Sequence, residues 1–414
     1  MSLFSSFALL LVQIPAILLI TLVCGDLLER LRQPRVVGEI LGGLLLGPLA
    51  PARLSPAASA FLFPPAELQP LETAGKIGLI LFLFLMGAEL DLGALRKNGG
   101  TTFAITFGSV YLPFAFGASL APELRIHFGF PETPPVVFML FVGIAMSITA
   151  LPVLARIIQD RKRSTRPVDS TVAATSLVSA AANDLLAWSL LAVALALARG
   201  PSSLLSAAVA WHLLLLVVFV AAMLFVVRPL ARLLLREGVA TWALVLAAIP
   251  FAILSGQISE ALGVHAFFGA FLAGLCFPLQ HNAWLQLEHA FSPIVQLTLP
   301  VFFALTGLHM DPAMLHLGNF GWLALILVTA VAGKFIGATL AARASGIGWR
   351  PAAQIGSLLN TRGLVELIVL SIGYKQHILS PALYTLFVLM ALLTTAMTSP
   401  LLDLLTPAQE AKSS

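Results

Sequence analysis

Residues 172–198 read VAATSLVSAAANDLLAWSLLAVALALA, an apolar stretch long enough to cross a membrane, with Asn183 and Asp184 near its middle. A charged side chain at the centre of a bilayer costs about 2.5 to 3.5 kcal/mol on insertion scales. A chain therefore keeps a carboxylate there only where it is paired or used. This stretch predicts a membrane-spanning helix that carries a functional site.

Two other apolar stretches also contain charged residues. Lys334 interrupts LVTAVAGKFIGATLAA (residues 327–342), and Arg362 and Glu366 interrupt GSLLNTRGLVELIVLSIG (residues 356–373). Ionisable residues inside membrane spans mark ion pathways and proton relays. Together these positions predict a transporter of small ions.

The composition excludes a water-soluble protein. Of the 414 residues, 59% are hydrophobic and 10% are charged, whereas soluble domains carry about 25% charged residues. The two cysteines lie in separate apolar runs, without the spacing of a disulfide framework or a zinc site. We expect no cofactor and no enzymatic activity. We also expect no nucleic-acid partner, because the net charge of +4 mostly reflects membrane topology.

Apolar runs of about 17 to 25 residues match the thickness of a bilayer core, and backbone groups in lipid must be satisfied within each run, so each run is a helix. The sequence predicts an all-α polytopic membrane protein of thirteen spans and a short tail at 406–414. The first span is expected to stay, since its start lacks a basic region and a cleavage site. The spans cover approximately residues 6–27, 36–50, 74–90, 101–120, 136–158, 171–198, 206–227, 240–260, 265–280, 293–309, 320–341, 352–373 and 383–404.

The distribution of basic residues predicts the orientation, because short cytoplasmic loops are enriched in Lys and Arg. Of the 23 basic residues, 16 fall on one side of the predicted spans and five on the other, and Lys334 and Arg362 lie inside spans. We therefore expect an outside amino terminus and a cytoplasmic carboxyl terminus in a bacterial plasma membrane.

Two internal similarities indicate a repeat. FLFLMGAELD (82–91) aligns with FFALTGLHMD (302–311), and GEILGGLLLGP (38–48) resembles GAFLAGLCFPL (269–279). Six spans, one linker span and six further spans would insert the two halves with opposite orientation, which is the inverted-repeat plan of secondary transporters. In that plan the site lies between the repeats near the midplane.

That plan also predicts one interrupted helix in each half. The fifth span contains Ser147, Thr149 and Pro152, and Pro152 cannot donate a hydrogen bond to the helix. The twelfth span contains the run from Asn360 to Gly363. Carbonyls and half-helix ends exposed at such breaks can hold ions. We expect two broken, crossing helices beside Asp184.

At these residues the chain resembles a known family. SITALPVLARI, AANDLLAW and LNTRGLVELIVLSIG, together with GEILGGLLLGP, PVFFALTGL and GKFIGAT, are similar to the membrane domain of the cation/proton antiporter superfamily. The chain resembles in particular plant cation/proton exchangers and bacterial Kef-type potassium/proton antiporters. The resemblance covers almost the whole chain.

The resemblance implies a homodimer with alternating access. Residues 6–90 and 240–309 would form a dimerising scaffold, 101–198 and 320–404 a moving core, and 206–227 a linker helix. Asn183 stands where electrogenic sodium antiporters carry a second aspartate, which argues against exchange of two protons per cation. The soluble nucleotide-binding tail of the potassium efflux proteins is not expected here.

The chemistry of the predicted site centres on Asp184, where a proton and an alkali cation would compete for one negative charge. Thr149 is a candidate for further oxygen ligands, and Asn183 either supplies a carbonyl oxygen or caps a broken helix. Hydroxyls that could line the ion path are those of Ser147, Ser176 and Ser179.

The other buried charges have supporting roles in this interpretation. Gly333, Gly337 and Ala341 would let another helix approach Lys334 closely. The resemblance implies that Lys334 balances the dipoles of the broken helices and the ion-binding acid. Arg362 and Glu366 are four residues apart, so they can pair along one helix. His281 and His289 are expected in a surface loop without a role in transport.

Exchange of K⁺ or Na⁺ for H⁺ is the leading hypothesis, and three others stay open. A gated channel would lack proton movement, and no filter-like run of carbonyls is evident. An intramembrane hydrolase would need a histidine at mid-depth beside its nucleophile, and the predicted spans have no histidine at that depth. A sodium-coupled symporter of similar architecture would be expected to have more than one sodium site.

Overall fold

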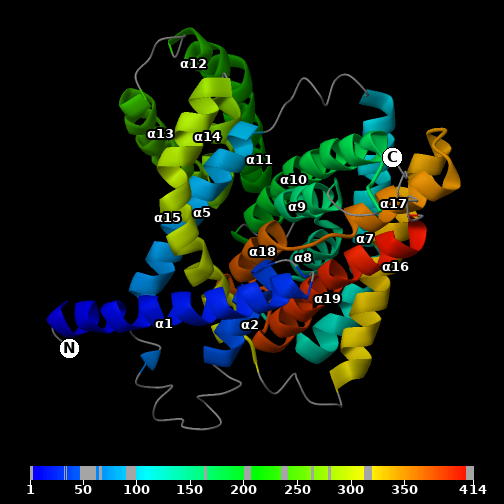
Figure 1. Cartoon of the computed structure of the whole chain (residues 1–414), viewed down its shortest axis with the longest axis horizontal. Coiled ribbons are helices and arrows are strands. Elements are labelled where there is room, and N and C mark those ends of the chain that lie inside the picture. Colours follow the sequence, from blue (N-terminus) through cyan, green and yellow to red (C-terminus); the bar gives the residue numbers. More distant parts are fainter. Residues whose placement is uncertain are drawn as a thin grey trace, which may run out of the picture. The chain divides into compact units, whose positions relative to one another are not determined.

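All regular structure in the described part of the chain is helical, as the sequence predicts (Figure 1). The computed structural model describes residues 3–31, 33, 35–46, 62–64, 68–89, 99–162, 166–199, 207–234, 241–262, 265–277, 281–311 and 319–406. The helices are α1 (Leu3–Arg30), α2 (Arg35–Leu44), α5 (Gln69–Glu89), α7 (Gly99–Phe128), α8 (Pro135–Ser147), α9 (Leu151–Lys162), α10 (Ser170–Arg199), α11 (Ala207–Ala222), the π-helical segment η3 (Met223–Val227), α12 (Arg228–Leu234), α13 (Thr241–Ala261), α14 (Ala266–Cys276), α15 (His281–Leu308), α16 (Phe320–Ala344), α17 (Trp349–Leu359), α18 (Leu364–Lys375) and α19 (Pro381–Leu405).

Among the described residues, fewer than thirteen helical segments have the length and hydropathy of a membrane span. Ten helical segments among the described residues are long and apolar enough to cross a membrane, and the bent pair α17–α18 makes eleven. The predicted spans at α2 and α14 are helices of 10 and 11 residues, whereas a span needs about 20. The chain is an integral, multi-pass membrane protein, and the count of thirteen is not confirmed.

The helices pack into two compact units, each built from separate stretches of sequence. Unit 1 comprises residues 1–27, 38–90 and 195–308, and unit 2 comprises residues 28–37, 91–194 and 309–414. The roles of scaffold, linker and moving core stay predictions.

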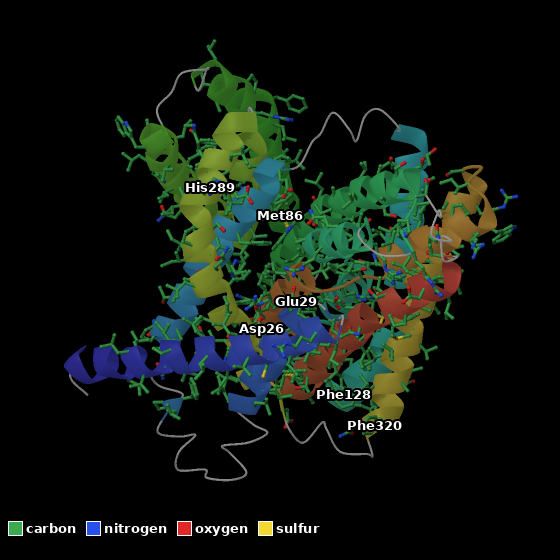
Figure 2. The ribbon with its side chains drawn as sticks, in the orientation of Figure 1. Asp26, Glu29, Met86, Phe128, His289 and Phe320 are labelled. Carbon is green, nitrogen blue, oxygen red and sulfur yellow. The ribbon has the colours of Figure 1, made fainter. Side chains whose placement is uncertain are left out.

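Within unit 1, α5 packs between α14 and α15 (Figure 1). A Cβ atom on Gly274 would lie 2.9 Å from the backbone nitrogen of Ala88, so α14 and α5 are in direct backbone contact. The structure corrects one expectation here, because α15 begins at His281 and extends beyond the predicted span. His281 and His289 therefore lie on a helix, not in a loop, and Figure 2 labels His289 on α15.

Within unit 2, α7 and α16 form a close pair. A Cβ atom on Gly108 would lie 2.6 Å from the carbonyl oxygen of Gly337, and one on Gly333 would lie 2.6 Å from the Cα atom of Pro113. Figure 2 labels Phe128 and Phe320 at the adjoining ends of the two helices, where the ring of Phe128 packs 5.5 Å from that of Trp322. The glycine spacing on α16 thus allows the close approach that the sequence predicts.

The start of α10 is fixed by a side-chain cap. The Asp169 carboxylate accepts hydrogen bonds from the backbone nitrogens of Thr171 (2.8 Å) and Val172 (3.4 Å). These backbone hydrogen bonds hold the pKa of the Asp169 carboxyl below its ordinary value. The cap satisfies donors that the first turn of a helix leaves without intrahelical partners. It sets the point at which the helix carrying Asp184 begins.

Candidate ion-binding site

Two broken helices cross in unit 2, as predicted. Residues 148–150 separate α8 from α9, and residues 360–363 separate α17 from α18. The axes of α17 and α18 differ by 43°. The backbone nitrogen of Ala150 donates to the carbonyl oxygen of Thr361 at 3.0 Å, which joins the two breaks. Pro152 is the second residue of α9, where its missing N–H leaves no helix hydrogen bond unmade.

Gly363 ends the second break in a conformation that other residues rarely adopt. Its φ is 155° and its ψ is −128°, a region populated almost only by glycine. A Cβ atom at this position would also lie 2.9 Å from the Cγ2 atom of Val153. Both the backbone conformation and the approach to α9 therefore require glycine.

The last four carbonyls of α8, which no backbone N–H of the helix can satisfy, all have partners. The Ser147 hydroxyl donates to Ile144 O at 2.9 Å. The Arg362 guanidinium donates to Ala145 O at 2.8 Å and to Met146 O at 2.5 Å. The Lys334 ammonium donates to Ser147 O. Two fully buried cations thus meet the negative end of the half-helix dipole.

The Thr149 hydroxyl is the polar centre of the crossing. It donates to Leu359 O at 3.0 Å and accepts hydrogen bonds from Asn183 Nδ2 at 3.0 Å and from Lys334 Nζ at 2.7 Å. One donor proton and two lone pairs are the full capacity of a hydroxyl. Thr149 lies in the first break, and its three partners come from α17, α10 and α16.

Asn183 connects α10 with α7 and with the first break. Its amide nitrogen donates to Ser109 Oγ and to Thr149 Oγ1, both at 3.0 Å. The Ser109 hydroxyl lies 3.3 Å from Asn183 Oδ1 and 3.0 Å from Thr106 O. Ser109 is a site residue that the sequence reasoning missed, although its place in a row of hydroxyl residues on α7 was a usable signal.

Asp184 lies next to this network but outside its hydrogen bonds. The residue is fully buried, and neither carboxylate oxygen has a hydrogen-bond partner among the described residues. A bare carboxylate in such surroundings is strongly disfavoured unless a proton or a cation neutralises it.

The other predicted residues fall in the same unit. Arg362 Nη1 lies 3.1 Å from Glu366 Oε1, so the predicted pair forms, with both side chains fully buried. The capping of α8 by Arg362 was not anticipated, because it joins residues more than two hundred positions apart in sequence. Ser176 and Ser179 are buried on α10 without hydrogen-bond partners among the described residues. No group of three or more His, Cys, Asp or Glu side chains suited to a resident metal ion occurs in the described part of the chain.

Broken helices that cross beside a buried carboxylate, in an all-helical membrane protein, place the chain among secondary ion transporters. The sequence profile of the family "Sodium/hydrogen exchanger, transmembrane" matches residues 16–404. The chain belongs to this family, which confirms the resemblance to cation/proton antiporters.

Individual relatives agree with this assignment. Cation/H(+) antiporter 20 of Arabidopsis thaliana is 38% identical over 409 residues, covering 95% of this chain and 48% of the relative. The Na(+)/H(+) antiporter NhaS4 of Synechocystis sp. is 36% identical over 398 residues, covering 93% and 94% of the two chains. The chain spans about half the length of the plant relatives it matches.

A solved structure supports the fold. The sodium proton antiporter MjNhaP1 from Methanocaldococcus jannaschii superimposes with a TM-score of 0.68 over 96% of each chain, at 18% identity. At that identity the likeness concerns the fold alone.

Proposed function

We propose that the chain exchanges a monovalent cation, K⁺ or Na⁺, for H⁺ by alternating access, with the two ions competing for Asp184. The observation that carries this proposal is the fully buried Asp184 carboxylate without a hydrogen-bond partner in the described structure. Its charge needs a neutralising ion before the site can pass through a desolvated state. A proton or an alkali cation serves equally, and binding of one excludes the other.

Further oxygen ligands for the cation come from Asn183 and Thr149. The Thr149 hydroxyl already has three partners, so a cation gains it only if Asn183 or Lys334 gives up its hydrogen bond. Proton and cation binding are then coupled to a rearrangement at the crossing of the two breaks. Membership of the sodium/hydrogen exchanger family supports transport of an alkali cation and of H⁺.

Lys334 acts as a fixed counter-charge in this scheme. Its ammonium group donates to Ser147 O and to Thr149 Oγ1, and these contacts stabilise the end of α8. With one titrating carboxylate, the exchange is one cation for one proton and electrically neutral.

The proposal extends to the whole protein. We place it in a bacterial plasma membrane with an outside amino terminus, as a homodimer that uses no cofactor and contributes to pH homeostasis. Residues 6–90 and 240–309 would hold the dimer, and residues 101–198 and 320–404 would move.

The test is cation-triggered proton movement in proteoliposomes that contain a pH-sensitive dye. Addition of Na⁺ or K⁺ to the wild-type protein should change the internal pH, and Asp184→Asn should abolish that signal because a neutral amide cannot exchange a proton. Glu123→Gln removes an exposed carboxylate of α7 and should leave the signal intact. An unchanged signal in Asp184→Asn would refute the site, and cation flux without proton movement would favour a channel.

A further inference from the structure

Two helices of unit 2 carry matching rows of hydroxyl or amide side chains. On each helix the residues recur at three- or four-residue spacing, so they share one face. All of them are buried. The row on α7 consists of Thr102, Thr106 and Ser109, and the row on α10 consists of Ser176, Ser179 and Asn183.

The two rows meet at one end and run together from there. Asn183 Nδ2 donates to Ser109 Oγ at 3.0 Å. One crossing, made by α8 and α9, separates α7 from α10, so α7 and α10 run in the same direction through the membrane. With the same rise per residue, Ser176 and Ser179 lie at the level of Thr102 and Thr106. Ile105 of α7 and Ala180 of α10 belong to the same apolar cluster.

Three hydroxyls in these rows have no hydrogen-bond partner among the described residues, namely those of Thr106, Ser176 and Ser179. By contrast, Ser147 and Ser189 of unit 2 each donate to a carbonyl of their own helix, although the hydroxyls of Thr339 and Ser357 also lack a partner among the described residues. A buried hydroxyl without any partner is unfavourable, and buried polar groups of this kind are normally satisfied by ordered water.

We propose that Thr102, Thr106, Ser176 and Ser179 form a water-filled hydroxyl seam that delivers protons to Asp184 from the ends at which α7 and α10 begin. Ser176 and Asn183 are about 10 Å apart along the helix axis, a distance that a few hydrogen-bonded waters cover. A proton enters the seam from bulk water, is passed between waters and hydroxyls, and forms an O–H bond on Asp184, so every oxygen in the seam regains its starting protons. The inference rests on the proposed role of Asp184.

The seam is suited to protons rather than to alkali cations. Its polar lining is hydroxyl groups without carboxylates, and the α10 positions beside it, Ala173, Leu177 and Ala180, belong to the apolar cluster. A dehydrated cation needs several oxygen ligands at once, whereas a relayed proton needs only a continuous chain of hydrogen bonds. Protons and cations would therefore reach Asp184 by different routes.

Radiolytic hydroxyl-radical labelling tests for the water directly. Single cysteines at Ser176→Cys and Ser179→Cys, in a protein whose Cys24 and Cys276 have been replaced, should be oxidised several-fold faster than cysteines at Ala338→Cys and Ala342→Cys. The control positions are fully buried in the apolar cluster on α16, outside the two rows. Equal oxidation at the four positions would overturn the seam. This readout does not depend on transport, so it separates the seam from the proposed function.

Stability and kinetics provide a second arm. If the hydroxyls are dry, Ser176→Ala and Ser179→Ala remove unfavourable buried groups and raise the Tm; if they are hydrated, the Tm does not rise. Ser176→Leu should lower the maximal exchange rate without changing the KM for the cation, because the larger side chain displaces water from the seam. Ser189→Leu changes an exposed serine of α10 and should alter neither the maximal exchange rate nor the KM for the cation. A raised Tm in both alanine variants, or an unchanged rate in Ser176→Leu, contradicts the proposal.

Discussion

At the scale of single residues, the Thr149 hydroxyl joins four separate parts of unit 2. It belongs to the first break, donates to α17 through Leu359 O, and accepts from Asn183 on α10 and from Lys334 on α16. Removing one oxygen would therefore leave three buried polar groups short of a partner. Leaving a buried polar group without its partner costs more free energy than the hydrogen bond contributed to stability.

We expect Thr149→Val, which keeps the shape but lacks the hydroxyl, to weaken cation binding. A lost contact of about 1 to 3 kcal/mol corresponds to a rise in KM of about 5-fold to 150-fold. The measurement is the cation dependence of dye-reported exchange in proteoliposomes. Thr329→Val is the matched control, since that exposed hydroxyl bonds only to Leu325 O of its own helix. An unaltered KM in Thr149→Val would remove this residue from the site.

At the scale of elements, each broken helix depends on groups that another segment supplies. Arg362 belongs to the second break, yet two of its nitrogens satisfy carbonyls at the end of α8, and the same guanidinium pairs with Glu366 on α18. The ion pair is fully buried. Breaking a buried pair strands the remaining charge, which is why single replacements are more harmful than the net worth of the pair.

Arg362→Met should lower the free energy of unfolding by about 3 to 5 kcal/mol, because Glu366 is left without its cation. The double variant Arg362→Met, Glu366→Met should be more stable than Arg362→Met alone, although the carbonyls of Ala145 and Met146 still lack a partner. Denaturant unfolding in detergent provides the measurement. The exposed pair Lys76–Glu260 serves as the control, where Lys76→Met should cost no more than about 1 kcal/mol.

Close packing of α7 against α16 gives a second prediction at this scale. Gly337→Ala introduces a Cβ atom 3.1 Å from the Cβ atom of Leu112 and close to the backbone of Gly108, which forces α16 outward and carries Lys334 away from Ser147 and Thr149. We expect lower thermal stability and slower exchange. Gly321→Ala lies on the same helix with no atom within 4 Å of its added methyl group. It should be neutral or slightly stabilising, since alanine favours a helix over glycine by about 1 kcal/mol. Equal behaviour of the two variants would contradict the backbone contact.

The sequence predicted the two breaks and the burial of Asp184 because each depends on local chemistry. Pro152 disrupts a helix by itself, and Asp184 is conspicuous inside an apolar run. Contacts between distant segments could not be predicted in this way. Nothing in the spacing around Arg362 indicates that its partners are Ala145 and Met146, and the i, i+4 relation to Glu366 favours only the local pair. Likewise, α2 and α14 are apolar enough to suggest spans, although the helices have 10 and 11 residues.

At the scale of the whole molecule, both compact units are assembled from interleaved parts of the chain. The chain passes from one unit to the other several times. Both units therefore depend on every span crossing the membrane in the predicted direction. An error in orientation would invert every loop. The excess of basic residues on one predicted side, 16 against five, is the feature expected to prevent it.

We expect the carboxyl terminus to face the cytoplasm. A fluorescent protein fused after Ser414 should fluoresce in a bacterial host, and alkaline phosphatase at the same position should be inactive, because each reporter folds on only one side of the membrane. A phosphatase fusion at the amino terminus, predicted to be outside, is the complementary arm. An active phosphatase at Ser414 would reverse the predicted topology.

The caps on α8 also have a consequence for how the protein is made. Lys334 and Arg362 follow the carbonyls that they satisfy by 187 and 216 residues. At a synthesis rate of about 5 to 20 residues per second, α8 waits about 10 to 40 s for its first cation after leaving the ribosome. During that interval the freed carbonyls and the Asp184 carboxylate lack the charges that later stabilise them. The newly made first half should therefore remain dependent on the insertion machinery, or on water within it, until the last third of the chain arrives.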